Sequence, residues 1–206
     1  MIQYSDEWWA ERIGKVTASK VVDICKGLKG KYLASRKNYM ADKIIEILTG
    51  QAPEGFTSKS MDWGTETEPM ARAVYEAETG NFVEEVGFIN HPIIDRLGAS
   101  PDGLTGTDIC LEIKCPNTAT YLDFVMKPII DRRYIYQMNC QMMCSERGLT
   151  HFVMYDPRLP DNMAFTMVEV KKDLVICAEI EAETKLFIME LDATVKWLKE
   201  KFPNEN

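Results

Sequence analysis

The sequence lacks the features that mark membrane, secreted, fibrous or disordered proteins. No apolar run approaches the roughly 20 residues that span a membrane, so we expect no membrane segment. The first twelve residues lack the apolar stretch of a signal peptide, and we therefore expect a protein of the cytoplasm. The 206 residues show no repeat or biased segment, and 46% of them are hydrophobic. This composition excludes the disordered and fibrous classes.

Cysteine and histidine do not occur in the pattern of a zinc site. The six cysteines include no Cys-x-x-Cys pair, and the two histidines lie far apart in the sequence. We expect reduced thiols, because a chain of this length buries roughly 70% of its unfolded surface and needs no disulfide to hold a core. The length favours one domain.

Positive charge is scarce over the whole chain but not at its start. The net charge is -8, and affinity for nucleic acid comes mainly from Lys and Arg facing phosphates. Residues 1–45 nevertheless contain nine Lys and Arg against five Asp and Glu, a net +4, while the remainder contains fifteen against twenty-seven, a net -12. The charge excludes a protein that coats DNA, but it allows binding through a local basic patch or through metal ions.

Hydrophobic periodicity predicts helices first, strands in the middle and helices again. The predicted helices cover 5–12, 17 to about 27, 35–48, 61–79, 120–145 and 173–202. The predicted strands cover 82–83, 86–89, 97–100, 109–114, 151–155 and 163–170. The order indicates a mixed α/β protein with one domain over 1–206, made of helices to residue 80, a sheet core over 81–170 and a last helix over 173–202.

The strongest chemical signal is Ser100-Pro101-Asp102-Gly103 followed by Leu111-Glu112-Ile113-Lys114. Glu112 and Lys114 are two apart on a predicted strand, so their side chains leave the same face. Asp102 begins the hairpin whose second strand carries Glu112. Two carboxylates beside one ammonium suit Mg²⁺ or Mn²⁺ and a water molecule to be activated. The alternative is that Glu112 and Lys114 form an ordinary surface ion pair.

Seven segments of the chain, in order, resemble those of a known nuclease family. They are Trp8 to Arg12, Arg12-x-Gly14-x-x-Thr17-Ala18-Ser19, Trp63-Gly64-x-x-x-Glu68 with Ala71-Arg72, Ser100 to Gly103, Leu111 to Pro116, Tyr134-x-x-Gln137 and Tyr155 to Arg158. Pro101-Asp102 with Glu112-Ile113-Lys114 resembles the PD-(D/E)xK nuclease core, and the whole set is similar to the phage lambda exonuclease family, also called the YqaJ or alkaline exonuclease type. The resemblance implies a restriction-endonuclease-like α/β core with a central mixed sheet flanked by helices.

The resemblance also implies a catalytic set of five side chains, which are Glu68, Asp102, Glu112, Lys114 and Gln137. The metal would be bound by Asp102, Glu112 and the backbone oxygen of Ile113, with Glu68 contributed by the preceding helix. Lys114 would be the catalytic lysine, and Gln137 would help to orient it. The implied chemistry is in-line attack on phosphorus by a metal-bound water, with two Mg²⁺ ions expected roughly 4 Å apart and Mn²⁺ able to substitute.

A further group of residues would hold the end of the DNA. The resemblance implies that Arg12, Ser19, Thr17 and Ser100 bind a 5′-phosphate, and that Met61 is an apolar wedge between terminal base pairs. Arg12 has a fork suited to bidentate phosphate contact. Thr17 and Ser19 lie at a predicted helix amino terminus, which favours anions. In the alternative, Ser19 only caps a helix and Met61 packs in the core.

The activity that the resemblance implies is a Mg²⁺-dependent 5′-to-3′ exonuclease acting on double-stranded DNA ends. It would degrade one strand to mononucleotides and leave a 3′ overhang for single-strand annealing recombination, in a bacterial or phage-infected bacterial cell. The resemblance further implies a homotrimeric ring and a single-strand annealing recombinase as partner. Two alternatives stay open, an endonuclease built on the same core and a non-catalytic module that binds DNA ends.

Overall fold

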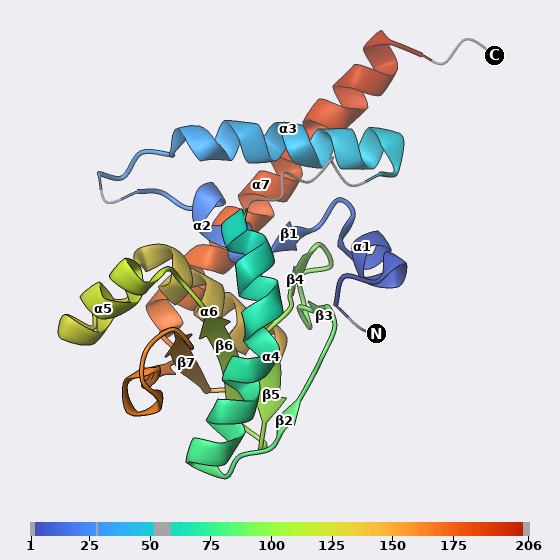
Figure 1. Cartoon of the computed structure of the whole chain (residues 1–206). Coiled ribbons are helices and arrows are strands. Elements are labelled where there is room, and N and C mark those ends of the chain that lie inside the picture. The colour runs from blue at the N-terminus through green and yellow to red at the C-terminus, as the bar shows by residue number, and fades with distance from the viewer. Residues whose placement is uncertain (1–2, 28, 52–58, 204–206) are drawn as a thin grey trace.

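A mixed sheet of five strands lies between layers of helices (Figure 1). The structure is a computed structural model that describes residues 3–27, 29–51 and 59–203, with only the backbone described at 59–61. Strands β6 and β7 are parallel, and the other neighbours are antiparallel. In spatial order the strands are β2 (Val83–Glu84), β5 (Gly103–Thr105), β6 (Ile109–Lys114), β7 (Leu149–Tyr155) and β8 (Phe165–Lys171).

Helices cover both faces of this sheet. Side chains alternate between the two faces along each strand, so each face has its own set of residues to bury. On one face, α4 (Lys59–Thr79) packs Ala71 and Tyr75 against Leu111 and Ile113 of β6. On the other face, α5 (Thr118–Met126) and α6 (Arg132–Cys144) pack against a second set of buried residues that includes Cys110. Glu112 and Lys114 share the parity of Cys110, so they point toward α6.

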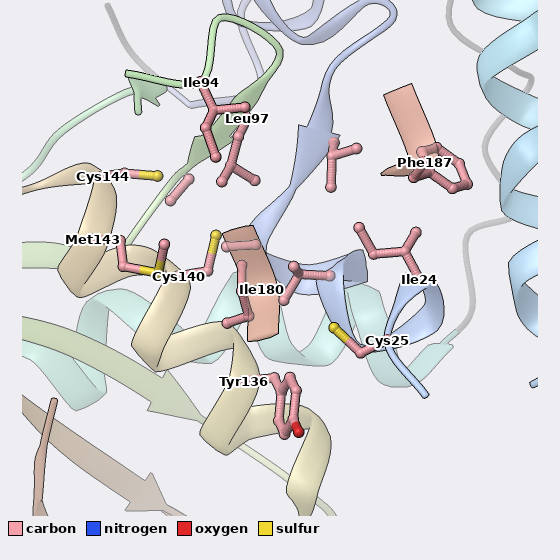
Figure 2. Packing of buried hydrophobic residues seen from close by; sticks show 14 of the residues in the cluster. Ile24, Cys25, Ile94, Leu97, Tyr136, Cys140, Met143, Cys144, Ile180 and Phe187 are labelled. Carbon is pink, nitrogen blue, oxygen red and sulfur yellow. The ribbon is translucent and has the colours of Figure 1, made fainter. Parts of the chain in front are cut away.

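The amino-terminal elements form a separate layer on α6 and the last helix. They are α1 (Asp6–Arg12), β1 (Val16–Thr17), a 3₁₀ turn (Ala18–Lys20), α2 (Val21–Ile24) and α3 (Ala34–Thr49), with β3 (Ile89–Asn90) and β4 (Leu97–Ala99) beside them. Figure 2 shows their shared core, where Ile24 and Leu97 lie near Cys140 of α6 and Ile180 of α7 (Leu174–Lys201). Gly98 is required in β4, because a Cβ there would lie 2.2 Å from the Phe88 ring.

Two of the predicted helices were wrong. The helix predicted from Thr17 is instead strand β1, which pairs in parallel with Leu97–Gly98, then the 3₁₀ turn and the four-residue helix α2. The helix predicted over 120–145 is two helices, since Pro128 lies between α5 and α6. Proline removes a backbone donor and clashes with the preceding turn of a helix.

The other predicted elements agree with the structure to within a few residues. The mixed α/β architecture with a sheet between helices is confirmed. β5 is an additional short strand, and a second 3₁₀ turn (Asp161–Met163) delays the start of β8 to Phe165. The six cysteines are free thiols, as expected. Within the described ranges, no helix has the length and apolar character needed to cross a membrane.

Candidate active site

The β5–β6 hairpin places Asp102 beside the strand that carries Glu112. The backbone N–H of Asp102 donates to the carbonyl oxygen of Leu111 at 3.0 Å. The N–H of Ile113 in turn donates to Oδ2 of Asp102 at 2.6 Å. These two bonds fasten the carboxylate of Asp102 to β6, so the expected hairpin is present and the two carboxylates are held by the same pair of strands.

Glu112 is fully buried and is surrounded by hydrogen-bond donors. From α6, Gln137 Nε2 donates to Oε1 of Glu112 at 2.7 Å and Gln141 Nε2 donates to Oε2 at 2.5 Å. The ammonium of Lys114 forms an ion pair with Oε1. A buried carboxylate is costly unless it is paired and hydrogen-bonded, and here both oxygens are satisfied. The surface-pair alternative for Glu112 is therefore wrong, since 0% of its side chain is exposed.

Burial and neighbouring carboxylates raise the pKa of two acidic groups of the site, Asp102 and Glu68. Burial raises the pKa of Asp102 well above its ordinary value, and Glu112 and Glu68 raise it further against the opposing effect of Lys114. Burial also raises the pKa of Glu68, partly offset by Arg72 and Lys114. Burial alone would lower the pKa of Lys114, but Glu112 and Asp102 outweigh it and raise this pKa above its ordinary value. Lys114 is therefore a stable cation among carboxylates that repel one another.

A cavity of about 420 Å³ lies at the site, and we call it the catalytic pocket. Its lining includes Glu68, Asp102, Ile113 and Lys114. No group of three or more His, Cys, Asp or Glu within the described ranges is close enough to enclose a metal ion. The protein donors that border the catalytic pocket are the carboxylates of Glu68 and Asp102 and the carbonyl oxygen of Ile113, while Glu112 lies behind them with both oxygens hydrogen-bonded. They fit Mg²⁺, which is commonly bound by one or two carboxylates and keeps several water molecules.

Glu68 is positioned by an ion-pair chain on the side of the catalytic pocket formed by α4. Its Oε1 lies 2.7 Å from Nη2 of Arg72, one turn along the helix. Nη1 of Arg72 lies 2.7 Å from Glu85, next to β2. Carboxylates on helices are usually solvated at the surface. Glu68 is an exception, because it lines the same pocket as Asp102.

Arg12 lies in an aromatic box near the catalytic pocket. Its guanidinium is 3.9 Å from the centroid of Trp8 and 5.7 Å from that of Phe88. The indole N–H of Trp8 donates to Oγ of Ser100 at 2.9 Å, and its ring lies 5.2 Å from the ring of Tyr4, which lines the catalytic pocket. Burial lowers the pKa of Arg12. A cation stacked on rings in this way keeps its hydrogen-bond donors for an anion.

The remaining residues predicted at the DNA end are placed differently. Ser19 is exposed in the 3₁₀ turn, and Ser100 lies beside Asp102. Thr17 is 4% exposed and caps no helix, while its backbone N–H donates to Tyr39 Oη at 3.1 Å. The expected helix-terminus contribution to anion binding therefore has no long helix behind it. Met61 lies in the first turn of α4, and its side chain is outside the described residues.

Two residues that sequence reasoning did not select also support the site. Gln141 is one of them, and its signal was the four-residue spacing from Gln137 on a helix. Arg158 is the other. Its Nε donates to the buried Asp156 at 2.6 Å, its Nη2 donates to the carbonyl of Pro116 at 2.8 Å, and its guanidinium stacks 4.6 Å from the Trp63 ring. Arg158 thereby ties the end of β6 to the start of α4.

Replacing Gln141 by leucine should destabilise the fold more than the same change at Gln137. Gln141→Leu leaves Oε2 of the buried Glu112 without its donor, whereas Oε1 keeps Lys114 when Gln137 is replaced. An unsatisfied buried polar group costs about 1–3 kcal/mol. Urea denaturation measures the difference, and equal unfolding midpoints for Gln141→Leu and wild type would refute this account of Glu112.

Comparisons with known proteins agree with the observed fold. A family model described as a YqaJ-like viral recombinase domain matches residues 7–148. The crystal structure of an alkaline exonuclease (LHK-Exo) from Laribacter hongkongensis is 46% identical, with 96% of this chain and 97% of that chain covered and a TM-score of 0.89. A structure of LHK-Exo in complex with dAMP matches to the same degree.

A more distant structure shares the fold. The phage related exonuclease from Haemophilus somnus 129PT is 13% identical over 89% of this chain and 96% of that chain, with a TM-score of 0.75. The comparison with curated proteins found no match. The match to the family model covers most of the chain, and a relative with nearly half of its residues identical spans almost all of it. The chain therefore belongs to the YqaJ-like viral recombinase domain family.

Proposed function

We propose that the protein is a Mg²⁺-dependent exonuclease that degrades one strand of double-stranded DNA from its 5′ end. The observation that carries this proposal is the set of Asp102, Glu112 and Lys114 on one hairpin, with the aromatic box of Arg12 next to it. Family membership supports a DNA exonuclease, and LHK-Exo is called an alkaline exonuclease. Its crystallisation with dAMP supports mononucleotides as products.

In the proposed mechanism, Asp102, Glu112 and the carbonyl oxygen of Ile113 would hold Mg²⁺, with Glu68 at the same pocket. When bound, the metal would supply a more acidic water molecule and would offset charge on phosphate; two ions are expected, and Mn²⁺ could substitute. Lys114 stays protonated because of its carboxylate neighbours, so it stabilises negative charge on the scissile phosphate rather than removing a proton. Gln137 and Gln141 hold Glu112 in the orientation that this requires.

The direction of degradation would come from recognition of the terminal phosphate by Arg12, which stacks on Trp8, the residue whose indole N–H donates to Ser100. Ser19 and Thr17 are proposed as further phosphate contacts from the family resemblance alone. The guanidinium is buried against Trp8 and faces no competing carboxylate within ion-pair distance among the described residues. A terminal phosphate is a dianion at neutral pH, so it gains more from this cation than an internal phosphodiester does.

The wider assembly is proposed from the family resemblance. We expect a homotrimeric ring around DNA, a single-strand annealing recombinase that receives the 3′ overhang, and the cytoplasm of a bacterial or phage-infected bacterial cell as location. The family description as a viral recombinase domain supports a role in recombination. Light scattering on the purified protein in the presence of a duplex would measure the number of subunits.

Duplexes labelled at the 5′ or the 3′ end, each with and without a terminal phosphate, test the proposed polarity. With Mg²⁺, wild type should release the 5′ label first, as a mononucleotide. Arg12→Ala should lower kcat/KM on the phosphorylated duplex about tenfold, because a charge-assisted contact is lost, and should change the rate on the unphosphorylated duplex much less. Release of the 3′ label first, or equal loss on both duplexes, would contradict the assignment.

A further inference from the structure

A second cavity adjoins the catalytic pocket, and we call it the side cavity. It has a volume of about 260 Å³ and shares three residues with the catalytic pocket, which are Lys114, Pro116 and Tyr134. The rest of its lining comes from α5, from the 127–131 connection, from Arg133 of α6, and from β7. The two cavities therefore lie side by side, with the ammonium of Lys114 and the Tyr134 ring between them.

The side cavity has an apolar floor. Phe124, Phe152 and Met154 form it together with Ile130. The ring centroids of Phe124 and Phe152 are 5.8 Å apart in an edge-to-face arrangement, and the Tyr134 ring lies 5.6 Å from Phe152. Phe124, Phe152 and Met154 are buried and support the floor from behind, while Ile129, Ile130 and Tyr134 expose more of their apolar surface to the cavity. Such a surface suits the flat face of a nucleobase.

The rim of the side cavity carries charges of both signs. Lys127 and Arg133 are exposed at the rim, and Lys114 lies on the shared wall. The guanidinium of Arg133 lies 4.7 Å from the centroid of Tyr134, and its Nε is 3.8 Å from Oδ2 of Asp131. Asp123 is the other carboxylate on the lining. Lys127 is the cation of this lining that forms no ion pair among the described residues, and a free cation beside an apolar floor favours a ligand that joins an apolar ring to a phosphate.

The side cavity and the aromatic box of Arg12 adjoin different residues of the catalytic pocket. Arg12 stacks on Trp8, which contacts Tyr4, and Tyr4 borders the catalytic pocket and a third cavity that shares no residue with the side cavity. Tyr134 borders the catalytic pocket and the side cavity. A strand whose terminal phosphate is at Arg12 and whose first internucleotide phosphate is at Lys114 would continue past Tyr134.

We propose that the side cavity binds the nucleoside on the 3′ side of the scissile phosphate, with the base on the apolar floor. Lys127 and Arg133 then face the next phosphate of the same strand. This inference rests on the proposed exonuclease function, because it needs a scissile phosphate in the catalytic pocket. Binding in the side cavity brings the enzyme into contact with the nucleotide that becomes the new 5′ end. Each cleavage therefore leaves the following nucleotide already bound.

A base-deletion experiment tests this subsite. Two 5′-phosphorylated duplexes are compared in single-turnover release of the first nucleotide, one intact and one abasic at the second nucleotide. The variants are Thr120→Trp, which fills the side cavity from its lining, and Leu122→Trp, a matched change at an exposed residue of α5 outside that lining. Because the substrates are the same for each enzyme, the effect of the abasic site on the duplex itself cancels.

Wild type and Leu122→Trp should prefer the intact duplex by about tenfold, the gain typical of one stacked base, and Thr120→Trp should show almost no preference. Ile130→Trp replaces Thr120→Trp if that variant does not fold. Normal hydrolysis of the intact duplex with the same preference in all variants would overturn the subsite and leave the exonuclease proposal standing. No hydrolysis of the intact duplex by wild type would overturn both.

Discussion

Lys114→Met should reduce hydrolysis of linear duplex DNA by about 10³-fold while DNA binding stays within a few-fold of wild type. The pKa of Lys114 is raised because Glu112 and Asp102 outweigh the cost of its burial, so the side chain is a fixed cation in the pocket where the proposed reaction would develop charge on phosphate. Removing one such preorganised group from an active site costs about 10²–10³ in rate, and loss of a full charge lies at the upper end.

The control for this prediction is Lys171→Met. Lys171 is an exposed lysine at the end of β8, so this variant removes the same charge without touching the site. It should hydrolyse DNA at the wild-type rate. Single-turnover hydrolysis and equilibrium binding to the same duplex measure the two quantities separately. A Lys114→Met enzyme that keeps more than a tenth of wild-type activity would show that Lys114 is only a structural partner of Glu112.

Asp102→Asn should slow hydrolysis by a similar factor, but it should raise the stability of the metal-free fold. Asparagine keeps an oxygen that can accept the N–H of Ile113, but it removes a negative charge that burial and Glu112 disfavour. We therefore expect the metal-free variant to unfold at a higher temperature than wild type. We also expect it to bind Mn²⁺ more weakly and to lose about 10³-fold in rate, because carboxylate oxygens are the ligands that such ions need.

Calorimetric titration with Mn²⁺ and thermal unfolding in EDTA measure these two effects independently of catalysis. Asp161→Asn is a suitable control, because Asp161 is exposed in the 3₁₀ turn before β8 and lines none of the three cavities. Unchanged Mn²⁺ affinity in Asp102→Asn would exclude Asp102 as a metal ligand. A lower unfolding temperature would contradict the conclusion that its charge is held against repulsion.

The centre of the site could be predicted from the sequence because its geometry is local. Glu112 and Lys114 share a face through the two-residue period of a strand, and Asp102 reaches them through one short hairpin. No helix packing had to be known. The same reasoning could not find Gln141, since its contact with Glu112 depends on how α6 lies across the sheet, 29 residues further along the chain.

The amino-terminal region was predicted less well because distant contacts decide it. Val16 and Thr17 form a strand only since Leu97 and Gly98, some 80 residues away, offer a parallel partner. The aromatic box around Arg12 likewise combines Trp8 from α1 with Phe88 from the segment before β3. The break between α5 and α6, in contrast, follows from Pro128 and could have been predicted from the sequence.

The most direct test of the proposed function compares linear DNA with covalently closed circular DNA of the same sequence. Wild-type protein with Mg²⁺ should release acid-soluble mononucleotides from the linear duplex and none from the closed circle, and EDTA should stop the release. Nicking or linearisation of the closed circle would indicate an endonuclease. Binding to linear ends without release of nucleotides would indicate a module that binds DNA ends, and either result would contradict the exonuclease account.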